Sequence, residues 1–210
     1  MSPRTTTADG LSYGDYEGRS RATQQHVLDS AVEVLIELGY SGASTLKIQQ
    51  RAGVSRGRLL HQYPDRDTLL MAAVQHIAEA RVTSSMSRAE WPAEPGARID
   101  AAIDTLWSTY HHGYFWAATE LWLAARSNPR LAEALAPKEQ ALGAAIRAAI
   151  DDMFGPALTR KPRYVDLREV LNTSMRGVAL TYAFDPRDPS GDPNLRTWKA
   201  LARRELGVRG

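Results

Sequence analysis

The chain of 210 residues contains no cysteine. Disulfide scaffolds, thiolate zinc sites, iron–sulfur clusters and cysteine nucleophiles are therefore excluded, and a reducing compartment is the expected location. Long hydrophobic runs are missing as well: the apolar run 121–125 is far shorter than the roughly 18 residues of a membrane span. The N-terminal residues hold no apolar core that could act as a signal peptide. We therefore expect a soluble, cytoplasmic protein with no membrane partner.

An excess of charge of one sign is also absent, because 26 Lys and Arg face 24 Asp and Glu for a net charge of +2. Any argument from charge must therefore be local. Valine and isoleucine are scarce, 17 residues in all against 53 alanines and leucines. Alanine and leucine lose little conformational freedom in a helix, whereas β-branched residues lose more. The composition therefore predicts an all-α protein.

The periodicity predicts about nine helices. Apolar residues from Val27 to Leu38 recur at helical spacing, and Gly39 is expected to end that first helix. Thr45 and Ser55 are expected to cap the second and third helices. The expected helices are about 20–38, 45–52, 56–63, 67–88, 97–112, 113 towards 128, 130–154, 163–184 and 194–206, with loops at 155–162 and 185–193.

The same pattern suggests three parts. Residues 1–18 carry turn-forming residues without a period, so we expect a flexible N-terminal tail. Residues 19–65 hold a long helix and two short ones, which we assign to a helix-turn-helix domain. Residues 66–210 hold the remaining helices and are expected to form a larger domain.

The informative segment is 45–63, two short helices joined by a turn that contains Gly53. Glycine suits a sharp turn because it has no Cβ to clash. The segment carries four basic residues and no acidic one, namely Lys47, Arg51, Arg56 and Arg58. Its apolar residues are spaced to fill the inner corner between the helices: Ile48, Ala52, Val54 and Leu59.

This charge pattern suits a surface that faces DNA phosphates. The start of the second short helix can enter the major groove, where Arg56 or Arg58 can pair with a guanine edge. The hydroxyls of Thr45 and Ser55, with helix N-terminal amides, suit phosphate oxygens. Two other interpretations stay open, since helix pairs with a glycine turn occur in many helical proteins and a basic run can simply be a solvated face.

Residues from about 20 to 70 resemble the DNA-binding domain of the TetR family of bacterial repressors. The resemblance is carried by Gly39-Tyr40, Ser44-Thr45, Ile48, Ala52-Gly53-Val54-Ser55, Gly57, Leu59, Tyr63, Arg66-Asp67 and Leu69-Leu70. Beyond residue 70 it continues as helix count and size and as the segment 120–126. The candidate DNA-binding residues are Thr45, Lys47, Ser55, Arg56, Gly57, Arg58, His61, Gln62, Tyr63 and Arg66.

The segment departs from the family pattern at four positions. The family usually has alanine at Gln49, a phosphate-contacting tyrosine at Leu60, often histidine at Gln62, and lysine at Arg66. The phosphate contacts are therefore expected to shift, onto His61 and Tyr63.

The resemblance implies that the remaining helices bind a ligand and form a homodimer, with the helices at 163–184 and 194–206 paired across a two-fold axis. A stripe of Leu171, Met175, Val178 and Tyr182 agrees with this, and Gly177 would allow a close approach. Burial within one subunit is the alternative. A dimer would read an inverted-repeat operator, with half-sites about 34 Å apart on double-stranded DNA.

Aromatic residues gather between residues 107 and 122, which suits the wall of an apolar ligand pocket. The candidate ligand-binding residues are Trp107, Tyr110, His111, Tyr114, Phe115, Trp122, Leu171 and Met175. The alternative is that these aromatics are plain core. Adjacent residues on a helix point about 100° apart, so His111 and His112 are not expected to share a metal ion. We expect no metal and no cofactor.

The function we expect is allosteric repression: a small-molecule effector of unknown identity favours a state in which the helix at 67–88 moves and spreads the two recognition helices. Two other classes are considered. A helical enzyme could use Asp151-Asp152, Glu120 or the histidine pair, but the sequence shows no nucleophile–base pair and no phosphate-binding loop, so we expect no enzyme. A dimeric binding protein could present its basic motif to an acidic partner protein.

Overall fold

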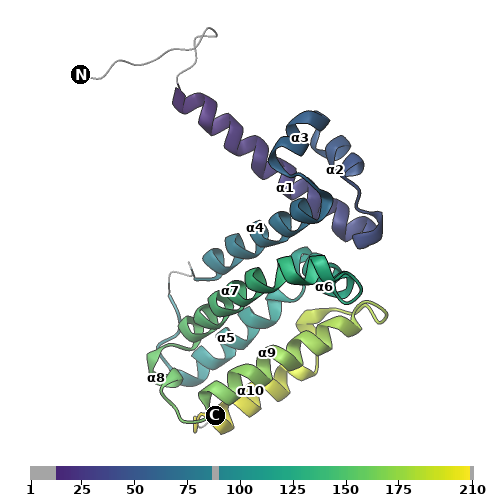
Figure 1. Cartoon of the computed structure of the whole chain (residues 1–210). Coiled ribbons are helices and arrows are strands. Elements are labelled where there is room, and N and C mark those ends of the chain that lie inside the picture. The colour runs from purple at the N-terminus through teal and green to yellow at the C-terminus, as the bar shows by residue number, and fades with distance from the viewer. Residues whose placement is uncertain (1–12, 87–89, 209–210) are drawn as a thin grey trace, which may run out of the picture. The chain divides into compact units, whose positions relative to one another are not determined.

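The computed structural model describes residues 13–86 and 90–208, which are mostly helical and contain no strand (Figure 1). The predicted all-α class is confirmed. The helices in this part of the chain are α1 (Tyr13–Gly42), α2 (Thr45–Ala52), α3 (Arg56–Gln62), α4 (Arg66–Met86), α5 (Pro95–Thr109), α6 (Gly113–Ala125), α7 (Pro129–Phe154), α8 (Pro156–Thr159), α9 (Tyr164–Thr181) and α10 (Asn194–Glu205), with one 3₁₀ turn, η1 (Pro189–Gly191).

Two predicted loops contain short helical turns. The segment 155–162 holds α8, which adds one helix to the nine expected. Pro156 begins it, because proline has the φ angle of a first helical turn and needs no hydrogen-bond partner there. The proline-rich segment 185–193 holds η1, in which Asp188 caps the turn by accepting from the N–H of Ser190 at 2.9 Å.

The N-terminal boundaries also differ from the prediction. Helix α1 begins at Tyr13, so residues 13–18 of the expected tail are helical, while residues 1–12 lie outside the described part. Gly39 interrupts α1 as predicted, with a non-helical φ of 66° and ψ of 174°, and a last turn continues to Gly42. The predicted cap at Thr45 is wrong. Ser44 has the extended backbone of a cap, and its Oγ accepts from the N–H of Lys47 at 3.3 Å.

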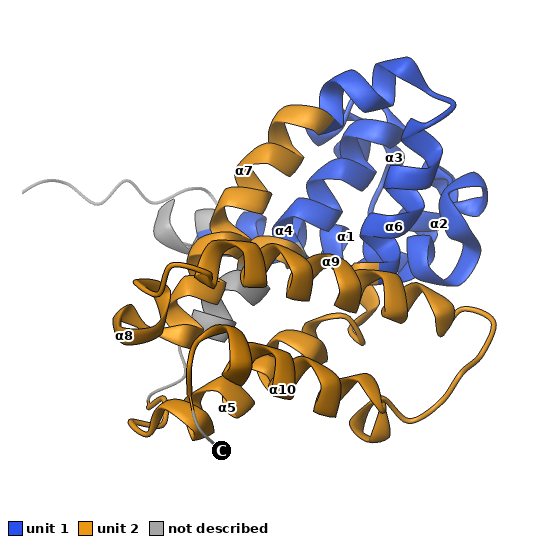
Figure 2. Cartoon of the chain, turned by 90° about the horizontal axis from the view of Figure 1, so that it is seen from below, with its two compact units in different colours: residues 1–77, 116–135 blue, residues 78–115, 136–210 orange. Residues whose placement is uncertain are grey.

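The chain divides into two compact units, coloured separately in Figure 2. The first takes in the described residues up to Ile77 together with Trp116–Leu135, and the second takes in the rest. The sequence interpretation placed a boundary after residue 65, whereas in the structure the start of α4, most of α6 and the start of α7 group with the first three helices. Helices α4, α6 and α7 each run from one unit into the other.

The first unit is held by one continuous apolar core. The buried stripe of α1, which includes Ala31 and Leu35, meets buried residues of every other helix in this unit. Removing this apolar surface from water is the main force that holds the helices together. The core residues outside α1 include Ile48, Ala52, Leu59, Leu69, Leu70, Leu121 and Leu131, all less than 7% exposed.

In the second unit, α10 packs against α5 and α9. Trp198 and Ala202 of α10 are buried, and two ion pairs at its margin reach α5: Lys199 with Asp104 at 2.7 Å and Arg203 with Asp100 at 2.7 Å. The last turn of α7 is capped by a side chain from α5, because Arg98 donates to the carbonyl oxygens of Asp152 and Met153 at 2.8 and 2.9 Å.

Two glycines of the helix-turn-helix segment form a matched pair for a stability test. A Cβ at Gly53 or at Gly57 would meet nothing within 4 Å, but only Gly53 has a positive φ, 62°. We expect Gly53→Ala to lower the free energy of unfolding by about 1 kcal/mol, since left-handed backbone strains any residue with a Cβ. Gly57→Ala should raise it by up to about 1 kcal/mol. Urea denaturation of both variants measures the difference, and equal effects would contradict this account.

Candidate nucleic-acid interface

Residues 45–63 form a helix-turn-helix in which α2 and α3 are joined at Gly53. The glycine closes α2, and its N–H lies within 3.4 Å of the carbonyl oxygen of Gln50. Ser55 caps α3 as predicted, because its Oγ accepts from the N–H of Arg58 at 3.3 Å. The predicted inner corner is buried at three of its four positions, Ile48, Ala52 and Leu59, and Val54 is partly buried against the same core.

Most of the candidate DNA-binding residues lie on the surface of this motif. Thr45 and Gln62 are half-buried. The candidate residues between these two positions are all exposed: Lys47, Ser55, Arg56, Gly57, Arg58 and His61. None of these residues is acidic. The exposed face of α3 therefore presents positive charge and hydrogen-bond donors to solvent.

Two candidates have other contacts. Tyr63 is only 7% exposed, and its hydroxyl accepts from Nε2 of Gln24 at 3.3 Å. The guanidinium of Arg66 lies over the ring of Tyr40 at 4.2 Å and pairs with Asp67 at 3.3 Å. Tyr63 is therefore less accessible than His61, and the shift of phosphate contacts onto these two residues stays a prediction.

Arg51, the fourth basic residue of the motif, is paired with acidic residues of α1. Its guanidinium donates to Glu37 and, at 3.3 Å, to Glu33. These hydrogen bonds, which Arg51 donates to Glu37 and Glu33, raise the pKa of Arg51 above its ordinary value. These ion pairs fasten α2 to α1. Counting charges within residues 45–63 missed them, because the partners lie 14 and 18 residues earlier in the chain.

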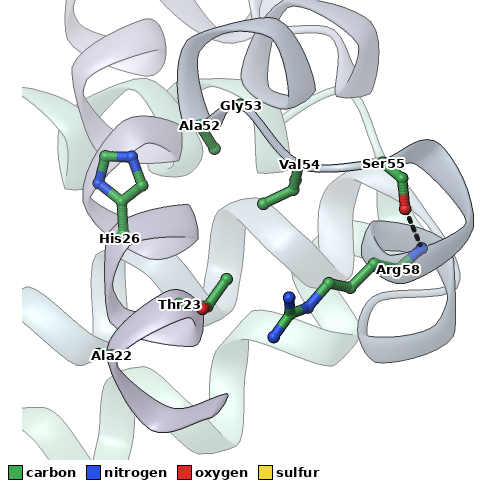
Figure 3. Close-up of a pocket in the computed structure, with 8 residues that line it drawn as sticks. All are labelled: Ala22, Thr23, His26, Ala52, Gly53, Val54, Ser55 and Arg58. Atoms are coloured by element: carbon green, nitrogen blue, oxygen red, sulfur yellow. Dashed lines mark hydrogen bonds between the residues drawn. The ribbon is translucent and has the colours of Figure 1, made fainter. Parts of the chain in front are cut away.

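A cleft of about 550 Å³ lies between α1 and the turn of the motif (Figure 3). Figure 3 shows the guanidinium of Arg58 pointing from α3 towards Thr23, with His26 one turn further along α1. The sequence interpretation named no α1 residue beside the motif. A signal was present, since Thr23 lies four residues before the buried Val27 and so extends the same helix face.

The predicted ligand-binding residues are divided between the two units. Trp122 belongs to the first unit, where it packs against the apolar core. The other seven lie in the second unit, on or next to α5, α6 and α9: Trp107, Tyr110, His111, Tyr114, Phe115, Leu171 and Met175. Of these seven, His111 and Tyr114 are half-buried and the rest are buried.

Trp107 is the centre of an aromatic cluster. Its ring centre lies 4.3 Å from that of His111, 4.9 Å from that of Trp198 and 5.9 Å from that of Tyr182. Its indole N–H donates to the carbonyl oxygen of Pro189 at 2.9 Å. This satisfies the one polar group of a 3% exposed side chain and joins α5 to η1 and α10.

A second contact ties α5 to α9. The hydroxyl of Tyr110 donates to Oδ1 of Asn172 at 2.5 Å, and its ring meets that of Phe115 edge-on at 5.4 Å. Burial raises the pKa of Tyr110 above its ordinary value. Leu171 and Met175 are both fully buried on α9. That these side chains form a ligand wall stays a prediction.

The loop between α9 and α10 is fixed by a buried carboxylate. Asp192 is 3% exposed, accepts from the hydroxyl of Tyr182 at 2.7 Å and from the N–H of Asn194 at 2.9 Å, and pairs with Arg187 at 3.2 Å. Burial opposes the charge, but these partners outweigh it and lower the pKa of Asp192. Burial and the bond to Asp192 raise the pKa of Tyr182 to about 12.

His111 lies beside this loop and is half-buried. Its Nε2 is buried with no hydrogen-bond partner. Burial and the neighbouring His112 lower the pKa of His111 below its ordinary value of 6.5.

Over the residues whose side chains are described, no three or more of His, Asp or Glu are grouped so that they could hold a metal ion. No described helix is long and apolar enough to cross a membrane.

An N-terminal helix-turn-helix whose second helix, here α3, is basic and exposed is typical of one class of helical proteins, the helix-turn-helix DNA-binding proteins. The model of the bacterial regulatory proteins of the TetR family matches residues 27–73, which span the second half of α1, all of α2 and α3, and the start of α4. In residues 27–73 the chain therefore carries the N-terminal domain of the TetR family. Its relatives are transcription regulators, which agrees with our expectation that the chain is not an enzyme.

Two relatives show how far the sequence similarity extends. The chain is 31% identical to the transcriptional regulator BetI of Proteus mirabilis over 109 residues, which are 51% of this chain and 54% of BetI. The chain thus aligns with about half the length of that protein. Over 77% of this chain and 80% of the relative, it is 27% identical to the regulator CymR of Pseudomonas putida.

The fold is similar to that of FadR from Bacillus subtilis, a transcriptional regulator solved in complex with stearoyl-CoA. The TM-score is 0.62 at 15% identity, over 88% of this chain and 98% of FadR. This similarity extends over both units of the chain and concerns the fold.

The lowered pKa of His111 predicts a pH effect on stability. In the unfolded chain this histidine takes up a proton as the pH falls through 6.5, while in the folded chain it stays neutral to lower pH. The unfolded state then binds more protons, so folding stability should fall as the pH drops below about 6.5. We expect His111→Gln to flatten the stability curve between pH 7 and pH 5, measured by urea denaturation. His26→Gln, on the exposed face of α1, is the control, and an unchanged slope in His111→Gln would refute the assignment.

Proposed function

We propose that the protein is a DNA-binding transcription regulator that responds to a small molecule, and that it works in the bacterial cytoplasm. The observation that carries this proposal is the exposed face of α3, where Arg56, Arg58 and His61 stand free of acidic neighbours within the motif that the family model matches. A positive surface on a helix-turn-helix suits the phosphates and groove edges of a duplex.

The recognition helix in this proposal is α3, whose first turn enters the major groove. Arg56 and Arg58 are within its first three residues, so either guanidinium can reach a guanine edge. Lys47 and His61 contact the phosphate backbone. The hydroxyl of Ser55 accepts from its own helix and still carries a hydrogen that it can donate to a phosphate oxygen.

We further propose a homodimer that forms through α9, but on a different face from the predicted stripe, because Leu171 and Met175 of that stripe are fully buried within the subunit. The helix buries one face and leaves apolar residues exposed on the other: Val170 is 49% exposed, Leu180 40% and Phe184, just beyond the helix, 80%. Gly177 lies on the same exposed face, and nothing lies within 4 Å of the position of a Cβ there. An apolar face with a central glycine suits close packing against the same face of a second copy.

The effector in this proposal is a small molecule that binds among the helices of the second unit. The support is the aromatic cluster of α5, α9 and α10 and the unpaired Nε2 of His111, which can accept or donate one hydrogen bond to a polar group of a ligand. FadR, which shares the fold, was solved with stearoyl-CoA. An effector that binds one arrangement of the helices more tightly than another would release the dimer from an inverted-repeat operator, and so act as an inducer of a repressor.

The experiment that tests the proposal is selection of bound sequences from random double-stranded DNA with the full-length protein. We expect enrichment of an inverted repeat whose half-sites are about one helical turn apart. A protein that instead uses its basic face for an acidic partner protein would enrich no sequence, and that result would overturn the proposal.

The selected duplex then serves to test the recognition helix. We expect Arg58→Ala to weaken binding by roughly 1–3 kcal/mol on the selected duplex and by much less on a scrambled one, because a base contact is specific. Arg51→Ala is the matched control and should cost less, since its guanidinium is already paired with Glu33 and Glu37. Fluorescence anisotropy measures both affinities. Equal losses on the two duplexes would make Arg58 a phosphate contact.

Two valines of α9 test the dimer. Val170 lies on the exposed apolar face with Gly177, while Val165, 55% exposed, points to a different side of the helix. We expect Val170→Arg to weaken dimerisation by about 3 kcal/mol, roughly 100-fold, because it buries an unpaired charge. Val165→Arg should leave the dimer intact. Sedimentation velocity over a range of concentrations gives both constants, and equal dimerisation of the two variants would rule out this interface.

A further inference from the structure

Tyr40, in the last turn of α1, is hydrogen-bonded on three sides. Its backbone N–H donates to Oε2 of Glu120 on α6 at 2.8 Å, and its carbonyl oxygen accepts from Nη1 of Arg66 on α4 at 3.3 Å. Its hydroxyl donates to Oδ1 of Asp67 at 2.8 Å and accepts from Nδ2 of Asn128 at 3.4 Å. All these residues belong to the first unit.

Further contacts join the partners to one another. Nδ2 of Asn128 also lies 3.3 Å from Oδ2 of Asp67, and Oδ1 of Asn128 caps α7 by accepting from the N–H of Leu131 at 3.2 Å. The guanidinium of Arg66 covers the ring of Tyr40. We call this set the Tyr40 clasp; it consists of Tyr40, Arg66, Asp67, Glu120 and Asn128.

The Tyr40 clasp contacts the backbone at the point where the chain turns from α1 towards α2. Gly39 has a φ of 66°, and a Cβ there would lie 3.2 Å from Oε2 of Glu120, so the carboxylate sits directly against the backbone of the kink. The carbonyl oxygen of Gly39 accepts from the N–H of Ala43 at 3.0 Å, and the next residue, Ser44, caps α2. The position of the kink therefore sets where the helix-turn-helix begins.

The partners of Tyr40 come from the three helices that run from the first unit into the second. Arg66 and Asp67 begin α4, Glu120 lies on α6, and Asn128 directly precedes α7. At or near its end in the first unit, each of these helices thus places a side chain in contact with Tyr40, the residue that leads into the helix-turn-helix. The contact is polar and partly exposed, since the side chains of Arg66 and Asp67 are 33% and 30% exposed. These hydrogen bonds are therefore within reach of water, while the ring of Tyr40 also packs against the apolar core of the unit.

We propose that the Tyr40 clasp positions the helix-turn-helix according to the arrangement of α4, α6 and α7. Tyr40, Glu120 and Asn128 are positioning residues, which hold the motif without touching DNA. This inference rests on the proposed function, because it concerns how that function is regulated. Coupling of this kind is reciprocal: whatever arrangement of the three helices favours DNA binding must itself be favoured by bound DNA.

The first arm of the test is hydrogen–deuterium exchange of the full-length protein without DNA. Tyr40→Phe removes only the hydroxyl, and Asn128→Ser keeps a cap for α7 but removes the amide donor. We expect amides in 43–62 to exchange roughly two- to tenfold faster in both variants. Tyr164→Phe is the matched control, since it removes a 2.7 Å hydroxyl bond to Asp151 in the second unit, and it should leave 43–62 unchanged. Unchanged exchange in Tyr40→Phe and Asn128→Ser would overturn the proposal.

The second arm adds the selected duplex. In the wild-type protein, bound DNA should slow exchange in 43–62 and also in 136–154, the part of α7 beyond the clasp. In Tyr40→Phe and Asn128→Ser, the change in 43–62 should remain and the change in 136–154 should be lost. Glu120→Ala should behave like them, and Glu120→Gln, which keeps an acceptor for the N–H of Tyr40, should restore the response.

The outcomes separate the clasp from the proposed function. A DNA effect on 136–154 that is absent in the wild type, or equal in all variants, would overturn the clasp as a coupling element while DNA binding stands. A wild-type protein that selects no DNA would overturn the proposed function, and the exchange of 43–62 without DNA would still decide whether the clasp positions the motif.

Discussion

The apolar stripe of α1 is the feature on which the helix-turn-helix depends. Helices α2 and α3 have eight and seven residues, and helices of this length have little stability of their own in water. They persist because Ile48, Ala52 and Leu59 are buried in a core that begins on α1. The same core takes in Leu121 and Leu131, so the packing that holds α3 also includes parts of α6 and α7. Apolar burial is not directional, however, and does not by itself fix the orientation of a helix.

The orientation of α2 and α3 is fixed by polar contacts around that core. Ser44 and Ser55 set the first residues of α2 and α3, Gly53 sets the angle between them, and the ion pairs of Arg51 hold α2 on α1. These contacts are individually weak, because most of them are exposed to water. Together they select one arrangement out of those that the core would accept. The same ion pairs also withdraw Arg51 of α2 from the basic face, which leaves Arg56 and Arg58, both on α3, as the guanidinium groups of that face.

The second unit uses its polar groups differently. There the aromatic rings of Trp107, Tyr182 and Trp198 pack together, the indole N–H of Trp107 donates to Pro189, and the hydroxyl of Tyr182 donates to Asp192. Buried polar groups are normally paired because leaving them unpaired is costly. The Nε2 of His111 departs from this rule, because it is buried without a hydrogen-bond partner.

Much of the fold could be predicted from local signals. Helical periodicity and glycine or proline at the ends predicted the order of the helices, the break at Gly39, the turn at Gly53 and the cap at Ser55, since each depends on residues within about four positions. Short elements and the exact position of a cap could not be predicted in this way. Helix α8 has four residues and no period to detect, and the choice between Ser44 and Thr45 as a cap depends on one backbone conformation.

The sequence by itself determined which residues of the motif are charged, which are apolar, and where the chain turns, because these follow from residue type and spacing. Only the tertiary structure decided which of them stay available to a partner. Burial of Tyr63 beside Gln24, the pairing of Arg51 with Glu33 and Glu37, and the meeting of Tyr40 with Glu120 join residues from 14 to 80 positions apart. Such contacts depend on how the helices pack in space, and helical spacing along one segment carries no information about a partner on another.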